Sequence, residues 1–215
     1  MTNLTKRIYS SFCLLIILFL SIYNHAIFFL FIIFCIYQIF YEFYNLLSKI
    51  FNYKNKIYIY FLLFLILLFL TYLFCFIWVN LNSKDEFDKL FLYVLITISI
   101  SSDIGGFIFG KTFKGRKLTK ISPNKTFSGM FGSYLTSIII VYIFFKNYID
   151  TQNLLFIVLF VSTVSQLGDL FISYLKRKAK IKDTGTILPG HGGILDRFDG
   201  LIFALIIGSL SKVIL

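Results

Sequence analysis

The sequence predicts an all-α protein, a polytopic integral membrane helix bundle of about seven transmembrane helices. Three observations lead to this prediction. Of the 215 residues, 58% are hydrophobic, whereas soluble domains are ~45–50% apolar. The apolar residues form runs close to the ~17–25 residues that a helix needs to cross a ~30 Å hydrocarbon core. The 21 Lys and Arg residues gather in a few of the segments between those runs.

Seven apolar runs qualify as crossings, and in chain order they cover residues 8–23, 26–47, 57–79, 90–110, 130–145, 154–175 and 198–214. The first, fifth and last are at the short end of the range. Only Asn24 and His25 separate the first two runs, so residues 8–47 could instead form a re-entrant hairpin. No signal-peptide cleavage pattern follows the first run, so we expect it to be retained.

The basic residues predict the orientation in the membrane. With a cytoplasmic N-terminus, 17 of the 21 Lys and Arg residues fall in cytoplasmic segments, as the positive-inside rule requires. The C-terminus then lies outside. Six of the ten acidic residues fall on the cytoplasmic side too, at Glu42, Asp103, Asp169, Asp183, Asp196 and Asp199. We expect Glu42 either to reach the membrane interface or to support a functional site.

Polar residues are unevenly shared between two parts of the chain. Residues 1–89 hold three predicted crossings and form a scaffold. Residues 90–215 form the predicted catalytic region, with cytoplasmic basic loops at 111–129 and 176–197. The net charge of +11 would suggest nucleic-acid binding in a soluble protein. Single-stranded nucleic acid needs basic residues interleaved with stacking aromatics, and loop 111–129 offers only Phe113 and Phe127, so no nucleic-acid partner is expected.

The most polar stretch runs from Ser173 to Asp199. It combines clustered cations with glycines, His191 and three carboxylates, Asp183, Asp196 and Asp199. Lys and Arg neutralise phosphate oxygens, glycines let backbone N–H groups approach an anion, and carboxylates beside phosphates usually hold Mg²⁺. A loop that only set topology would need the positive charge alone, so phosphate chemistry is the favoured interpretation.

Two carboxylates interrupt apolar helices upstream of this stretch. Asp103 follows a run of Ser and Thr residues, and such an intramembrane carboxylate is a functional candidate, although small residues can also serve helix packing. Ser165, Asp169 and Ser173 are spaced by four and share one helix face. A purely structural buried Asp169 is the alternative. Residues 105–112 formally match a P-loop, but the match ends a membrane helix and follows no strand, so we discount it.

Loop 111–129 alternates basic residues with glycine and contains Ser122, Lys125 and Thr126 just before the next apolar run. Such a loop could hold the negative charge of a triphosphate at the cytoplasmic mouth of the bundle. The alternative is a loop that only sets membrane topology.

These segments together resemble the phosphatidate cytidylyltransferase (CDP-diacylglycerol synthase) family. The family pattern S-x-x-K-R-x4-K-D-x-G-x2-[LIF]-P-x-H-G-G-[ILV]-x-D-R-x-D is matched from Ser173 to Asp199, and GDL at 168–170 and ISPNKT at 121–126 also resemble it. The resemblance covers roughly residues 95–210. Two positions depart from the family: Ser128 stands where many members carry Glu, and residues 103–107 are only a loose form of the family's Asp-containing stretch.

The resemblance implies that CTP and phosphatidate react to give CDP-diacylglycerol and pyrophosphate. It implies Mg²⁺ at Asp169 and Asp196, with a second cation such as K⁺ nearby. The implied catalytic residues are Asp169, Lys182, Asp183, His191, Asp196, Arg197 and Asp199. The implied substrate-binding residues are Asp103, Ser122, Lys125, Thr126, Ser173, Lys176, Arg177, Gly192 and Gly193. It also implies a homodimer in a bacterial inner membrane, with the active site facing the cytoplasm.

Two other functions remain open at this point. A CTP-dependent polyprenol or phytol kinase would transfer the γ-phosphate to an alcohol, but the fit of the C-terminal pattern disfavours it. A transporter of an anionic solute should carry polar residues at the bilayer midplane and an internal repeat. The polar residues of this chain gather on one side instead, and no repeat is visible.

Overall fold

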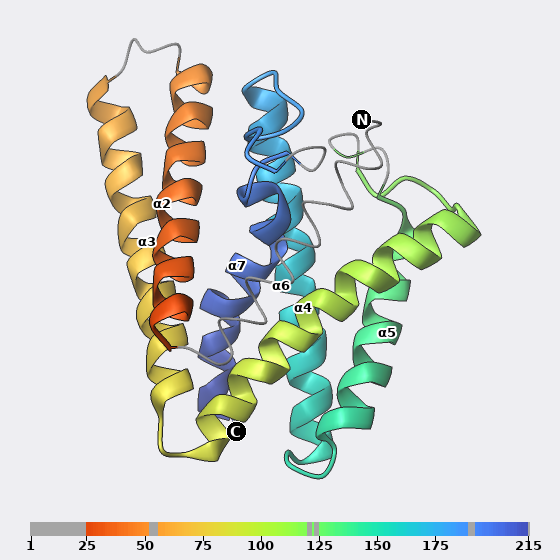
Figure 1. Ribbon diagram of the computed structural model, residues 1–215. Coiled ribbons are helices and arrows are strands. Elements are labelled where there is room, and N and C mark those ends of the chain that lie inside the picture. Colours follow the sequence, from red (N-terminus) through yellow and green to blue (C-terminus); the bar gives the residue numbers. More distant parts are fainter. Residues whose placement is uncertain (1–24, 52–55, 120–121, 123–124, 189–191, 215) are drawn as a thin grey trace. The chain divides into compact units, whose positions relative to one another are not determined.

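The computed structural model describes residues 25–51, 56–119, 122, 125–188 and 192–214 (Figure 1). The ordered elements of this part are helical. They are α2 (His25–Ile50), α3 (Lys56–Asn82), α4 (Glu86–Phe113), α5 (Phe127–Phe145), α6 (Thr151–Lys178), α7 (Leu195–Gly208) and the 3₁₀ helix η1 (Ser209–Ile214). The all-α fold class is therefore confirmed.

Helices α2 to α6 are each long and apolar enough to cross a membrane. They coincide with the predicted runs 26–47, 57–79, 90–110, 130–145 and 154–175, so the chain is an integral membrane protein. The predicted run 8–23 lies outside the described residues. The last run, 198–214, forms the 14-residue α7 followed by η1, and 14 residues of α-helix rise only about 21 Å.

The described chain forms two compact units, and each is considered separately. Unit 1 comprises the described parts of Met1–Thr71 and Leu175–Phe198, and unit 2 comprises those of Tyr72–Tyr174 and Asp199–Leu215. In unit 1, α2 and the first part of α3 lie side by side (Figure 1). Leu47, Ile59 and Leu63 form the buried contact between them. Much of the rest of α3 is exposed and apolar, which is expected of a surface that faces lipid.

Small polar residues join the helices of unit 2. Ser133 donates to the Ser102 carbonyl (2.7 Å) between α4 and α5. Ser99 and Ser165 hydroxyls lie 3.1 Å apart between α4 and α6, and Ser162 donates to Ser102 at 3.1 Å. The serines before Asp103 therefore serve helix packing, as membrane helices commonly use Ser to bond across an interface.

Glycines bring the backbones of unit 2 close together beside two predicted site residues. A Cβ added to Gly168, which precedes Asp169, would lie 2.6 Å from the Phe203 ring of α7. A Cβ on Gly200, which follows Asp199, would lie 2.7 Å from the Ser165 hydroxyl. The α6–α7 contact within unit 2 thus depends on the absence of side chains at these positions.

The α4–α5 contact gives a prediction for Gly105→Ala. The new methyl carbon would lie 2.5 Å from the Gly132 carbonyl oxygen and 2.9 Å from Thr136 Cβ. Overpacking costs about 1–3 kcal/mol, which exceeds the roughly 0.8–1 kcal/mol gained in helix propensity. We expect a lower melting temperature in detergent.

Gly110→Ala is the matched control for this prediction. It changes the same helix in the same way, but its nearest contact is 3.2 Å, to the Thr126 hydroxyl. Equal melting temperatures for the two variants would show that the close approach at Gly105 does not limit stability.

Candidate functional site

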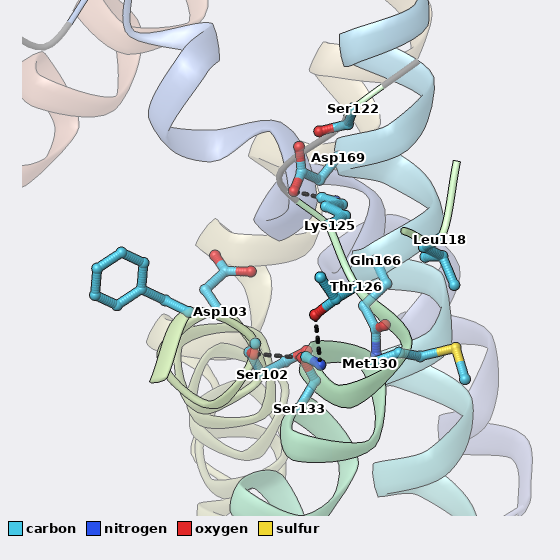
Figure 2. Close-up of a pocket in the computed structure, with 13 residues that line it drawn as sticks. Ser102, Asp103, Leu118, Ser122, Lys125, Thr126, Met130, Ser133, Gln166 and Asp169 are labelled. Carbon is cyan, nitrogen blue, oxygen red and sulfur yellow. Dashed lines mark hydrogen bonds and ion pairs between the residues drawn. The ribbon is translucent and has the colours of Figure 1, made fainter. Parts of the chain in front are cut away.

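A cavity of about 310 Å³ opens within unit 2 among α4, the start of α5, α6 and the loop that joins α4 to α5 (Figure 2). Its polar lining includes side chains from all four segments. They are Ser102, Asp103, Ser122, Lys125, Thr126, Ser133, Gln166 and Asp169. The sequence predicted five of these eight, and it did not single out Ser102, Ser133 and Gln166 as parts of the site.

Backbone hydrogen bonds fix the end of the α4–α5 loop at the cavity. Leu118 N–H donates to the Lys125 carbonyl (2.8 Å), and Phe127 N–H donates to the Arg116 carbonyl (3.0 Å). The Thr126 side chain then caps α5 by accepting from Gly129 N–H at 3.1 Å, the usual role of a Thr at this position. The Lys125 carbonyl and the two residues that follow it are therefore fixed by hydrogen bonds, which holds Lys125 at the cavity.

Lys125 and Asp169 form an ion pair inside the cavity (Figure 2). Their side chains keep 25% and 28% of their surface exposed. Ser173, one turn further along α6, lies 3.5 Å from the Asp169 carboxylate. Because exposed ion pairs contribute little to stability, this pair is better explained as a charged site that is open to a ligand.

Asp103 brings a second carboxylate to the same cavity (Figure 2). The like charge of Asp169 repels the Asp103 carboxylate, and the opposite charge of Lys125 attracts it. Hydroxyl and amide oxygens complete the lining, so the donor set fits a hard cation such as Mg²⁺, which prefers oxygen ligands. Among the described residues, no three His, Cys, Asp or Glu side chains form a metal cluster, and the cavity offers these two carboxylates.

A second polar cluster lies in unit 1, around residues 179–188 and 192–194, which lie between α6 and α7. These residues are here called the Asp196 loop, after the α7 carboxylate that they contact. Asp196 accepts hydrogen bonds from Lys176 Nζ (2.8 Å), Thr184 N–H (2.8 Å), Thr184 Oγ1 (3.0 Å) and Gly193 N–H (3.0 Å). Three of these four bonds end on Oδ2. Burial favours a higher pKa for the Asp196 carboxyl, but the bonds from Lys176, Gly193 and Thr184 outweigh it and the pKa lies below its usual value.

Gly192 shows why this loop needs glycine. Its φ angle is +88°, in the left-handed region that only glycine adopts readily. A Cβ there would lie 2.8 Å from the Asp196 carboxylate. Gly192 also exchanges two backbone hydrogen bonds with Leu188, at 3.0 and 3.1 Å.

Glu42 of α2 is the residue of this cluster whose role the sequence left undecided. Its side chain is buried, with 1% exposed. It accepts hydrogen bonds from Thr184 Oγ1 (2.5 Å), Ile194 N–H (2.9 Å), Leu195 N–H (3.0 Å) and Gln38 Nε2 (3.1 Å). It therefore supports the Asp196 loop and does not face the membrane interface. The spacing of Gln38 and Glu42, four apart in an apolar helix, was the available signal.

The remaining predicted site residues lie in the loop between α6 and α7 or at the helix ends beside it. Arg177 donates to the Ile181 carbonyl at 3.5 Å, and Lys182, Asp183 and Arg197 are exposed. Asp199, in unit 2, accepts from Gly200 N–H at 2.9 Å. His191 lies outside the described residues. The roles assigned to all these residues stay predictions.

The pKa of Asp196 leads to a prediction about acid stability. Because the folded-state pKa is lowered, ionised Asp196 stabilises the fold above its unfolded value of ~3.9, and this contribution is lost as the pH falls through the folded pKa. Lys176→Met removes a bond that lowers this pKa, while burial remains. The variant should therefore begin to lose melting temperature at a higher pH than the wild type.

Lys178→Met is the control, because it removes one exposed positive charge from the same end of α6. Melting temperatures of all three proteins in detergent between pH 7 and pH 3 would be compared. An equal acid onset for Lys176→Met and Lys178→Met would contradict the assignment of the Lys176–Asp196 pair.

Comparison with known proteins finds bacterial relatives of this chain. A protein of Rickettsia conorii is 41% identical over 143 residues, which is 62% of both chains. A protein of Bacillus subtilis is 40% identical over 131 residues, 59% of this chain and 49% of its own length. A protein of Rickettsia typhi is 44% identical over 130 residues, 56% of this chain and 57% of its own length.

All three of these proteins are named phosphatidate cytidylyltransferase. The chain spans between 49% and 62% of their length. The sequence profile of the Cytidylyltransferase family matches residues 5–213, nearly the whole chain. This chain therefore belongs to the cytidylyltransferase family.

Proposed function

We propose that this protein is a phosphatidate cytidylyltransferase, which transfers CMP from CTP to phosphatidate and releases pyrophosphate. The observation that carries the proposal is the cavity with its Lys125–Asp169 ion pair and the second carboxylate of Asp103. A site that binds phosphates beside cations needs positive groups for the first and carboxylates for the second. The names of the three relatives support the choice of substrates.

The chemistry is a phosphoryl-group substitution. A phosphate oxygen of phosphatidate attacks the α-phosphorus of CTP, the new P–O bond forms, and the bond from that phosphorus to the pyrophosphate oxygen breaks. A phosphomonoester has a second pKa near ~6, so the attacking group is already largely ionised at neutral pH. Catalysis is then mainly positioning and charge neutralisation.

The residues of the chain divide this work. Lys125, Lys176, Arg177, Lys182 and Arg197 hold phosphate oxygens, and Asp103, Ser122, Thr126 and Ser173 line the substrate's path. Asp169 holds Mg²⁺, which supplies charge neutralisation at the phosphates when it is bound. Asp196 is the second metal ligand that the family resemblance implies, and its Oδ1, which accepts a hydrogen bond from Lys176, has more capacity left than Oδ2, which accepts three.

The protein is further proposed to work as a homodimer in a bacterial inner membrane, with its N-terminus and its active site on the cytoplasmic side. The distribution of basic residues supports this orientation, and the bacterial relatives support the location. Seven crossings follow if residues 8–23 and 198–214 each cross as well. A second cation such as K⁺ completes the proposed site.

A radiolabel assay tests the function. Purified protein in detergent receives phosphatidate, Mg²⁺ and CTP labelled at either the α- or the γ-phosphate, with EDTA as the metal control. Metal-dependent lipid label from the α-phosphate alone is the expected result. Label from the γ-phosphate with an added prenol would instead identify a kinase, and no lipid label from either position would reject the proposal.

The same assay tests Asp169→Asn, which should abolish turnover. A neutral amide is a weak Mg²⁺ ligand and a poorer partner for Lys125, whereas the fold should persist because the pair is partly exposed. Asp150→Asn, at an exposed position in a loop of the same unit, is the matched control. Turnover of Asp169→Asn close to that of the control would reject the role of this carboxylate.

A further inference from the structure

Glu42 lies in the part of the chain that the sequence predicts to be scaffold, yet its carboxylate contacts the Asp196 loop. Three of its four hydrogen bonds come from Thr184, Ile194 and Leu195, which are more than 140 residues away in the sequence. A buried carboxylate is costly unless several donors compensate it. These donors therefore have to stay in place around Glu42, and Glu42 in turn fixes their positions.

The backbone of the loop closes directly on this carboxylate. A Cβ on Gly185 would lie 2.9 Å from Glu42 Oε1, and a Cβ on Gly193 would collide with Oε2. A side chain at either of these two glycines would thus meet the Glu42 carboxylate first. Glycine at these positions is explained by the approach of the backbone to Glu42.

Thr184 connects Glu42 to Asp196. Its hydroxyl donates to Glu42 Oε2 at 2.5 Å, while its backbone N–H donates to Asp196 Oδ2 at 2.8 Å. Glu42 also accepts from Ile194 and Leu195 N–H groups, where α7 begins, and a carboxylate is favoured at a helix N-terminus. Asp196 follows Leu195 directly in that helix, and one of its two backbone donors is Thr184, so Glu42 holds a residue on each of these two connections.

We propose that Glu42 is a positioning residue of the site: it orients Asp196 by holding the Asp196 loop and the first turn of α7 through Thr184, Ile194 and Leu195. It acts on the reaction through Asp196 and touches neither substrate nor reacting atoms. The effect on turnover rests on the proposed cytidylyl transfer, whereas the effect on the loop does not.

Two substitutions remove the interaction with little change in side-chain size. Glu42→Gln keeps the shape but leaves one oxygen and an NH₂ group, so two of the four donors lose their acceptor and face a donor. Thr184→Val removes the hydroxyl and with it the contacts to Glu42 and to Asp196, while the backbone bond to Asp196 stays. Thr184→Ser keeps the hydroxyl. Glu86→Gln, at an exposed position in the first turn of α4, is the control for the loss of one carboxylate.

Hydrogen exchange measures the loop without any assay of activity. Peptides that cover residues 184–196 should exchange about tenfold faster in Glu42→Gln, since a hydrogen bond to a charged group is worth that factor or more. Thr184→Val should show the same change to a smaller extent. Peptides from α4 and α5 should be unchanged, and Thr184→Ser and Glu86→Gln should resemble the wild type.

Turnover is the second readout. We expect kcat of Glu42→Gln to fall at least about tenfold, since small misplacements of reacting groups cost up to ~100-fold, with KM for CTP close to that of the wild type. Thr184→Val should lose part of the wild-type activity, whereas Thr184→Ser, which keeps the hydroxyl, should retain it.

Three results would overturn the inference: unchanged exchange in residues 184–196, an equal acceleration along the whole chain, or a normal kcat in Glu42→Gln. A wild-type protein that transfers no cytidylyl group would reject the proposed function. The exchange measurement would then still decide whether Glu42 holds the loop.

Discussion

A carboxylate among apolar helices must receive cations or hydrogen-bond donors, and the polar parts of this protein are built to meet that requirement. The cost of an uncompensated buried charge is several kcal/mol. Asp169 meets it with Lys125, Asp196 with Lys176 and two backbone N–H groups, and Glu42 with backbone and side-chain donors. Most of these partners lie in loops or at helix ends, so the three carboxylates help to determine where the loops lie.

The carboxylates meet this requirement in two different ways. Asp169 pairs with a single flexible side chain, and both partners are about one quarter exposed. Such a pair can separate at small cost when a phosphate or a cation arrives, because solvent already screens it. Glu42 is buried at 1% exposure and receives half of its bonds from fixed backbone groups. A carboxylate that is buried and held by backbone donors suits support better than chemistry.

Much of the fold could be predicted because crossing a membrane leaves a strong signal in the sequence. The five long spans followed from apolar length alone. Asp103 and Asp169 could be singled out because a carboxylate inside an apolar run is conspicuous. The last run was visibly short, but the end of its α-helix could not be predicted, since hydropathy counts apolar residues and does not register that α7 gives way to η1 after Gly208.

The parts that the sequence could not predict depend on the rotation of helices and on backbone donors. Glu42 could point to lipid headgroups or inward, and only the packing of α2 decides between them. The N–H groups of Gly193, Ile194 and Leu195 are present in every residue type except proline, so no motif reveals which carboxylate they will bind. Ser102, Ser133 and Gln166 were missed for a related reason, because uncharged polar residues in a membrane helix commonly serve helix packing.

The distribution of small residues separates the helices that carry the cavity from those that do not. In the most apolar part of each helix, half of α4 and 44% of α6 are buried, against 28% of both α5 and α2 and 17% of α3. Serines and glycines allow α4, α5 and α6 to pack closely enough for their hydroxyls to bond across the contacts. Bulky apolar residues would have buried more surface, but they would have held the backbones apart and left no polar lining beside Asp103 and Asp169. Helix α3 does not line the cavity, so its exposed surface needs only to be apolar.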